Sequence, residues 1–170
     1  GENRPADPSA FAQVNTGLTV AICNAIAAQM ANGGRRVPLV LASSTQAERD
    51  NPYGQSKLAA EHAVQALAQD AGNPVAVFRL PGVFGKWCKP NYNSVVATFC
   101  HNIAQDLPLQ ISDENTSIRL VYVDDLVSAL LEMVSSRWSG LVRPDVDPEY
   151  SIKLGELAEQ ISAFKNCRTN

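Results

Sequence analysis

Tyr53 and Lys57 have the side chains whose types and spacing best suit proton-transfer chemistry. A phenol and an ammonium group four residues apart lie on one face of a helix, about one turn from each other. A phenol is almost entirely neutral at pH 7, but a fixed cation nearby favours the phenolate and eases proton exchange with a substrate hydroxyl. Tyr53 is therefore a candidate general acid or base, although a pair at this spacing also arises by chance.

Ser44 adds a hydroxyl at the end of the apolar run that precedes this pair. The run, residues 37–42, has no polar alternation and is typical of a strand covered on both faces in a parallel sheet. At the carboxyl end of such a strand, Ser44 could hydrogen-bond the same oxygen that Tyr53 protonates, as in a carbonyl reductase. Serine is also a common turn residue after a strand, so both interpretations stay open.

Asn15 is a polar residue inside a long apolar stretch that predicts a helix. The helix is expected to begin at Asp7-Pro8, with a capping carboxylate and a proline in the first turn, and to end at residues 32–34. Asparagine in mid-helix is typical either of an exposed position or of a polar task. Gly54, directly after Tyr53, would allow a close approach of another backbone segment.

The elements that must position these side chains form an α/β pattern. A second helix after Pro52 ends near Gly72, and the apolar run 75–78 follows, which completes a strand, helix, strand crossover. Residues 82–93 predict a long loop and a candidate binding segment. Helices are expected over 94–104 and 154–164, and a strand over 118–123; the carboxylates of Asp124 and Asp125 are expected to cap the helix that follows. Because no interior linker divides the chain, residues 1–170 are predicted to form a single domain.

Composition excludes several functional classes. The 170 residues carry 14 basic and 17 acidic side chains, a net charge of −3 without a basic cluster, so no nucleic-acid partner is expected. The longest apolar stretch, residues 17–30, is shorter than the roughly 20 residues of a membrane helix, so no membrane partner is expected. The polar N-terminus predicts a cytoplasmic protein. The four cysteines and two histidines lack metal-ligand spacing, so no metal is expected, and Cys100 beside His101 is interpreted as buried packing.

A family resemblance rests on five motifs in order. They are Val14-Asn15-Thr16-Gly17, the strand ending in Ser43-Ser44, residues 51–58 (NPYGQSKL), residues 78–85 (FRLPGVFG) and residues 119–125 (RLVYVDD). These resemble the motifs of the extended short-chain dehydrogenase/reductase family, the NAD-dependent epimerases and dehydratases. Residues 3–5 (NRP) and 87–94 (WCKPNYNS) resemble in particular the bifunctional UDP-sugar epimerase/reductases of capsular polysaccharide synthesis. The implied fold is a Rossmann-like parallel sheet with flanking helices.

The resemblance also implies roles for individual residues. Tyr53 would be the acid or base, Lys57 would assist it and hold the nicotinamide ribose, Ser44 would orient the substrate carbonyl, and Asn15 would anchor a water in the proton relay. The nicotinamide would lie against the backbone of Pro81, Gly82 and Val83. The substrate would meet Ser44, Thr45, Asn93, Ser94 and Arg119, the last at its diphosphate. A guanidinium suits phosphate oxygens, although Arg119 is also compatible with an ordinary surface position on a strand.

The activity implied is NADPH-dependent reduction of the 4-keto group of a UDP-4-keto-6-deoxy-N-acetylhexosamine by a homo-oligomer, with NAD(H) as the alternative cofactor. Two other functions stay open: a nucleotide-sugar 4-epimerase that keeps its NAD, and a non-catalytic sensor or scaffold of the same fold. Residues 45–47 (TQA) stand where dehydratases carry an acidic pair, so dehydration is disfavoured.

The sequence lacks Gly-x-Gly-x-x-Gly, the loop that holds a dinucleotide pyrophosphate at a helix N-terminus. The resemblance therefore implies an N-terminally truncated fragment: the C-terminal part of the reductase domain, including its substrate-binding portion, without the glycine-rich half and without the cupin domain of the relatives. Such a fragment should bind NADP(H) weakly or not at all and be inactive alone.

Overall fold

The structure is a computed structural model that describes residues 2–167. It divides into two compact units, each made of two stretches of the chain. The first unit is Gly1–Pro81 with Ser128–Val146, and the second is Gly82–Val127 with Asp147–Asn170. The prediction of one domain over residues 1–170 stays a prediction. The α/β class is confirmed, because parallel strands joined by helices build the first unit.

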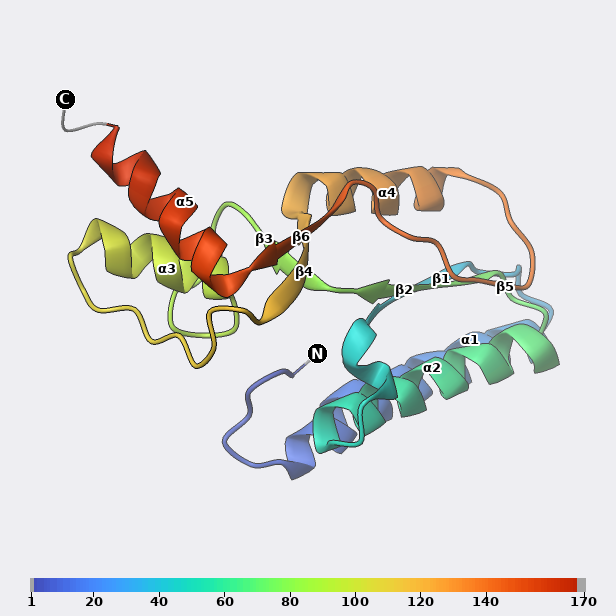
Figure 1. Ribbon diagram of the computed structural model, residues 1–170. Helices are drawn as coiled ribbons and strands as arrows, with labels where there is room; N and C mark the ends of the chain where they lie inside the picture. The colour runs from blue at the N-terminus through green and yellow to red at the C-terminus, as the bar shows by residue number, and fades with distance from the viewer. Residues whose placement is uncertain (1, 168–170) are drawn as a thin grey trace. The chain divides into compact units, whose positions relative to one another are not determined.

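The first unit is a parallel sheet with two helices packed side by side along one face (Figure 1). The strand order is β1-β2-β5, and both pairings are parallel. In chain order the elements are the π-helix η1 (Phe11–Gly17), α1 (Leu18–Ala31), β1 (Leu39–Ser44), the 3-10 helix η2 (Thr45–Glu48), α2 (Pro52–Asp70), β2 (Val75–Leu80) and β5 (Leu141–Val142).

The start of α2 follows from its sequence. The Asn51 side chain accepts a hydrogen bond of 2.8 Å from the backbone N–H of Gly54, and Pro52 occupies the first turn, where its missing N–H does no harm. After the helix ends, Gly72 has a φ of +67°, a left-handed conformation that glycine adopts without strain. The chain then enters β2, so the predicted crossover is confirmed.

The first helix departs from the regular form that the sequence predicts. The Asp7 carboxylate accepts from the backbone N–H of Ser9 at 2.8 Å, as expected of a cap. Residues 11–17 are wound as a π-helix before the α-helix proper, and Asn15 is the buried residue of that segment. The joined helix Phe11–Ala31 is long and apolar enough to cross a membrane by length and composition, a test that core helices of other proteins also pass. The absence of a membrane partner stays a prediction.

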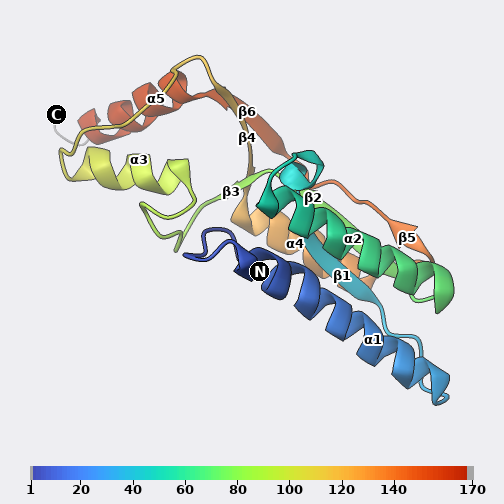
Figure 2. The ribbon, with the colours of Figure 1, turned by 90° about the horizontal axis from the view of Figure 1, so that it is seen from below.

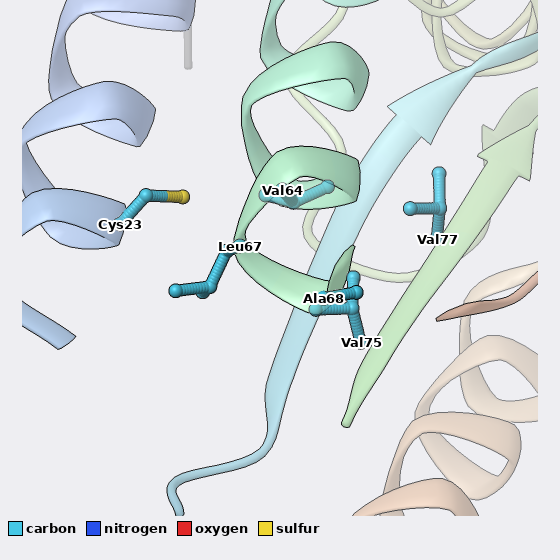
Figure 3. Close-up of a cluster of buried hydrophobic side chains, with 6 residues drawn as sticks. All are labelled: Cys23, Val64, Leu67, Ala68, Val75 and Val77. Carbon is cyan, nitrogen blue, oxygen red and sulfur yellow. The ribbon is translucent and has the colours of Figure 1, made fainter. Parts of the chain in front are cut away.

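The core of the first unit lies between α1, α2 and the sheet. Its buried side chains are small or branched and fill the space where the two helices approach β2 (Figure 3). They are Cys23, Val64, Leu67, Ala68, Val75 and Val77. Because β2 is buried along residues 75–78, its continuously apolar sequence correctly predicts a central strand.

The second unit has its own sheet, of order β3-β4-β6. Its elements are β3 (Gly82–Phe84), α3 (Val95–Ala104), β4 (Ser117–Tyr122), β6 (Glu149–Lys153) and α5 (Leu154–Asn166). The β3–β4 pairing is parallel, the β4–β6 pairing antiparallel, and α3 packs beside α5 (Figures 1 and 2). The helix α4 (Val123–Ser135) begins in this unit with Asp124 and Asp125 in its first turn, as predicted.

Three predictions are wrong in detail. Residues 82–84, predicted as the beginning of a loop, form β3, because β4 supplies a parallel partner that local sequence does not reveal. The strand β5 lies within residues 140–148, which the polar and proline-rich sequence predicts as a connection, and it has only two residues. No element was predicted for β6, which is mostly exposed. Cys100, interpreted as buried packing, is exposed on α3; burial around its thiol nevertheless raises the pKa of Cys100, which disfavours the nucleophilic thiolate.

Candidate active site

The first two turns of α2 bring Tyr53 and Lys57 together. The Lys57 Nζ lies 5.8 Å from the centroid of the Tyr53 ring, so the predicted placement on one helix face is confirmed. The same Nζ donates a hydrogen bond of 3.2 Å to the backbone carbonyl oxygen of Ala42 in β1. The ammonium group is thereby held at the carboxyl end of a parallel strand, where α/β folds bind their ligands.

The Tyr53 ring packs against η1. Phe11 of η1 lies edge-on against it, with 5.6 Å between ring centroids and 64° between planes. The Ser56 hydroxyl donates to the backbone carbonyl oxygen of Tyr53 at 2.7 Å. The aromatic contact restricts the ring, and the side chain stays half-buried.

Ser44 is buried at the last position of β1, where it caps η2. Its Oγ accepts a hydrogen bond of 3.1 Å from the backbone N–H of Gln46. Because the oxygen acts as acceptor there, the hydroxyl hydrogen is available for donation to another oxygen. The turn role and the proposed role toward a substrate carbonyl are therefore compatible, and Thr45 follows as the first residue of η2.

Gly54 allows the segment that follows Ser44 to lie directly against the first turn of α2. A Cβ atom at this position would come within 2.4 Å of the backbone oxygens of Gln46 and Arg49, closer than any side chain tolerates. The close backbone approach expected of Gly54 is confirmed, and it brings η2 against the residue next to Tyr53. The sequence thus places the end of β1 and the start of α2 in contact.

Asn15 is buried rather than exposed, so the exposed interpretation is wrong. Its Nδ2 donates to the Ser56 Oγ at 3.0 Å and to the backbone oxygen of Glu2 at 2.9 Å, and its Oδ1 accepts from the Glu2 N–H at 2.8 Å. Through Ser56, Asn15 connects to the backbone of Tyr53. Its polar task in this structure is to tie the N-terminal segment to α2; the water-anchoring role stays a prediction.

Two opposing effects act on the Lys57 ammonium. Burial lowers the pKa of Lys57 below the ordinary lysine value, and the nearby Glu61 carboxylate opposes that decrease. A cation close to a phenol favours the transfer of the phenol's proton to a substrate. The site therefore combines a phenol that can donate a proton with an ammonium group whose pKa depends on burial and on Glu61.

Sequence reasoning missed the carboxylate in this region. Glu61 is 2% exposed and lies one turn beyond Lys57 on α2, where it contacts Ser43 and Arg79. A signal for it is present in the sequence: Glu61 stands three residues from both Leu58 and Val64, on the stripe of the helix predicted to face inward. A charged residue at such a position requires a buried partner.

The remaining predicted residues, apart from Pro81, belong to the second unit, which is described by itself. Gly82 and Val83 lie in β3; a Cβ at Gly82 would lie 2.9 Å from a methyl carbon of Leu120 and 3.2 Å from the backbone oxygen of Arg119, so β3 packs closely on β4 at this glycine. Asn93 is exposed before α3, and Ser94 caps that helix by accepting from Ala97 N–H at 3.3 Å. Pro81 is the last residue of the first of the two stretches that form the first unit.

Arg119 presents its guanidinium to a carboxylate. The Nη2 donates to Glu149 Oε2 at 2.7 Å, and Nε donates to the other oxygen, so the pair is bidentate across β4 and β6. Diphosphate and carboxylate oxygens suit the same planar fork. The pairing lowers the pKa of Glu149, and the role of Arg119 toward a substrate diphosphate stays a prediction.

The second unit also contains a cavity of about 850 Å³ that the sequence did not reveal. It lies among α3, β4, β6 and α5, and its lining is predominantly apolar. Phe84, Leu120 and Phe164 are among the lining side chains. Its size is that of a small-molecule pocket, but the polar groups that would fix a ligand's orientation are few.

Comparisons with known proteins agree with the motifs. Residues 2–143 match the model of the NAD dependent epimerase/dehydratase family. A UDP-2-acetamido-2,6-beta-L-arabino-hexul-4-ose reductase of Pseudomonas aeruginosa is 50% identical over 168 residues, which are 99% of this chain and 44% of the reductase. The crystal structure of the capsular polysaccharide assembling protein CapF from Staphylococcus aureus superposes with a TM-score of 0.74 at 38% identity, over 86% of this chain and 41% of that one.

A more distant structure shows the fold alone. UDP-glucuronic acid 4-epimerase from Bacillus cereus, solved with UDP-glucuronic acid and NAD, has a TM-score of 0.82 at 14% identity, over 96% of this chain and 55% of the epimerase. The chain spans less than half the length of the reductase and of CapF.

Proposed function

Since this chain belongs to the NAD dependent epimerase/dehydratase family, we propose that the full-length gene product is a nucleotide-sugar reductase whose proton-donating residues lie here. The substrate is a UDP-4-keto-6-deoxy-N-acetylhexosamine, and the reductant is NADPH. The 50% identical relative, which is named as a reductase of a UDP-linked hexulose, supports the substrate class. The observation that carries the proposal is the Tyr53–Lys57 pair held at the carboxyl end of β1.

The mechanism assigns one step to each of three side chains. The Tyr53 hydroxyl donates its proton to the substrate carbonyl oxygen as that oxygen becomes negative. The Lys57 ammonium lies 5.8 Å from the Tyr53 ring and stabilises the phenolate left behind. The Ser44 hydroxyl, whose oxygen already accepts from Gln46, donates a second hydrogen bond to the same carbonyl oxygen.

The donors of the first unit fit one end of a nicotinamide cofactor. The Lys57 ammonium and the Tyr53 hydroxyl can both donate hydrogen bonds to ribose hydroxyls. The ammonium lies in the carboxyl-terminal half of β1, where α/β folds bind their ligands. When bound, the cofactor supplies the hydride to the carbonyl carbon. Pro81, Gly82 and Val83 would meet the nicotinamide through their backbone. The NADP(H) preference is part of the proposal, with NAD(H) as the alternative.

The UDP part of the substrate is assigned to residues of the second unit. Arg119, with Asn93 and Ser94, would bind it, with the guanidinium exchanging the Glu149 carboxylate for the diphosphate, whose oxygens suit the same planar fork. We include homo-oligomerisation in the proposal: α1 exposes Leu18 and Ile22, which lie one turn apart on the same helix face, and association between copies would cover them. A cytoplasmic location belongs to the same proposal.

The test is product analysis with the purified full-length gene product, the 4-keto sugar and NADPH. A reductase consumes one NADPH for each alcohol formed, whereas a 4-epimerase returns its cofactor unchanged and a scaffold does neither. We expect Tyr53→Phe to lower kcat by about 100-fold or more, because the proton donor is removed. Tyr122→Phe is the matched control, since it removes a phenol hydroxyl from β4 and should retain wild-type turnover. Turnover by Tyr53→Phe at the wild-type rate would refute the assignment.

A further inference from the structure

A buried carboxylate connects the two elements that hold the proposed proton donors. The Ser43 hydroxyl donates to Glu61 Oε1 at 2.5 Å, and the Arg79 guanidinium donates to both carboxylate oxygens, with Nη2 to Oε2 at 2.8 Å and Nε to Oε1 at 3.1 Å. Ser43 and Arg79 are register partners on β1 and β2. Glu61 therefore closes a bridge from α2 to both strands.

Glu61 is placed to act on two residues of the site at once. Ser43 directly precedes Ser44, so the bond from Ser43 to Glu61 fixes the last residues of β1 against α2. On α2 itself Glu61 follows Lys57 by one turn, and its charge favours the ammonium form that burial disfavours. Neither the proposed cofactor contacts nor the proposed substrate contacts use Glu61.

We propose that Glu61, held by Arg79, is a positioning residue of the proposed reductase: it fixes the end of β1 through Ser43 and places a negative charge one turn from the Lys57 ammonium. This inference rests on the proposed function. Stability alone accounts poorly for the pair, because well-packed apolar side chains in place of a buried ion pair are often neutral or stabilising. A role of the Glu61 carboxylate in positioning the site explains why this charge is buried.

The charges around Glu61 and Lys57 come from few elements. The elements packed against α2 are η1, η2, α1, β1 and β2, and their titratable side chains are Cys23, Glu48 and Arg79. Cys23 belongs to the apolar core cluster, and Glu48 is an exposed carboxylate that pairs with the Arg79 Nη1. On α2 itself the titratable neighbours of Lys57 are Tyr53 and Glu61. The negative charge that acts on Lys57 is that of Glu61.

The experiment compares three variants of the full-length gene product. Glu61→Gln keeps the shape and a hydrogen-bonding group but removes the charge, and it leaves Arg79 without its buried partner. The double variant Glu61→Gln with Arg79→Met removes both charges and should fold even if the single variant does not. Glu48→Gln is the matched control, because it removes an exposed carboxylate from the same guanidinium.

We expect both Glu61 variants to lower kcat by about tenfold, with KM for the sugar changed less than about twofold. The alkaline limb of kcat against pH should move to lower pH by about half a unit or more, since loss of the Glu61 negative charge makes the Lys57 ammonium easier to deprotonate. Glu48→Gln should keep the wild-type profile. A double variant that is folded and has wild-type kcat and pH profile would overturn the inference.

A second measurement does not depend on activity. Lysine amines labelled with ¹³C-methyl groups can be titrated by NMR, with the Lys57 signal assigned by its loss in Lys57→Met. We expect the Lys57 signal of the double variant to titrate at lower pH than in the wild type, and an unchanged titration would contradict the role of Glu61. Absence of NADPH consumption by the wild type would instead refute the proposed function, so the two failures are distinguishable.

Discussion

At the scale of single residues, Lys57 illustrates how chemistry and stability oppose each other. Its ammonium lies partly out of water, donates to the Ala42 carbonyl oxygen and has a lowered pKa because burial disfavours the charge. A lysine with a folded-state pKa below its unfolded value weakens the folded state wherever the group is charged. The site therefore keeps a cation at some expense of folding stability.

We expect Lys57→Met to abolish turnover and yet to raise the free energy of unfolding at pH 7 by about 0.5 kcal/mol, a small gain because solvent still screens the charge. The sign follows from proton linkage: the unfolded state binds the proton more tightly, so the penalty of the wild type is complete below the folded-state pKa. It fades as the pH rises toward the ordinary value of 10.5. Urea unfolding across this range is the measurement, with the exposed Lys89→Met as control. A gain that grows with pH would contradict the sign.

The residues of the site differ in how readily the sequence reveals them. Tyr53 and Lys57 are four residues apart, so they lie close together on one face of any α-helix. Ser44 follows an apolar run whose end is clear in the sequence. Asn15 was singled out, but whether it was buried depended on a partner, Ser56, that lies 41 residues away. Glu61 was not predicted as a functional residue, because only the hydrophobic positions of its helix indicate which face is buried. Its partner Arg79 lies on β2, and the local sequence does not reveal that pairing.

At the scale of elements, the junction between η1 and α2 depends on one buried amide. Asn15 makes three hydrogen bonds, two to the backbone of Glu2 and one to Ser56, which in turn donates to the backbone of Tyr53. The residue sits in a π-helical segment, which is less regular than an α-helix and relies on such side-chain contacts. Its removal takes this partner from two part-buried backbone groups of Glu2 and from the buried hydroxyl of Ser56.

We expect Asn15→Ala to lower the free energy of unfolding by about 1–3 kcal/mol, the range for a lost buried hydrogen-bonding partner. Alanine favours the helix more than asparagine does, so a loss of stability would arise from the contacts and not from helix propensity. Gln13→Ala, an exposed change on the same π-helix, is the control and should be within about 0.5 kcal/mol of the wild type. Chemical denaturation followed by circular dichroism measures both; equal stability of the two variants would show that the Asn15 bonds contribute nothing.

Elements with strong local signals were predicted well. The strand β2 has an uninterrupted apolar run, and the helix α2 begins with a proline after an asparagine cap. The observed bounds of both elements agree with the predicted ones within about two residues. The strands β3, β5 and β6 have two to five residues, and each exists because a neighbour supplies hydrogen bonds. Pairing over distances of more than 30 residues, as between Arg119 and Ser151, leaves little trace in local sequence.

At the scale of the whole molecule, the division of the chain into two units distributes the predicted site residues between them. Ser44, Tyr53 and Lys57 belong to one unit, whereas Asn93, Ser94 and Arg119 belong to the other. The motifs predicted the residues but not this division, because each unit joins stretches that are distant in the sequence. Composition and periodicity describe neighbours along the chain, and they carry no information about such discontinuous assembly.

The affinity of this 170-residue chain for NADPH can be bounded from its donors. Lys57 and Tyr53 offer about two hydrogen bonds to the ribose, worth about 1.5–3 kcal/mol each where a charge takes part. Association itself costs about 4 kcal/mol or more, so the surplus is at most about 2 kcal/mol and corresponds to dissociation constants of tens of millimolar or weaker. The backbone amides that would bind the pyrophosphate require a Gly-x-Gly-x-x-Gly turn, which this sequence does not contain.

We therefore expect titration calorimetry of this chain with NADPH to give no saturable heat at micromolar concentrations. Lys57→Met should give the same trace as the wild type, because the residue's contribution is too small to register without a pyrophosphate site. A sub-micromolar dissociation constant for the wild-type chain would show that other groups bind the dinucleotide. Binding would then have to come from residues outside the motifs, since the ribose donors of α2 supply too little free energy to reach such an affinity alone.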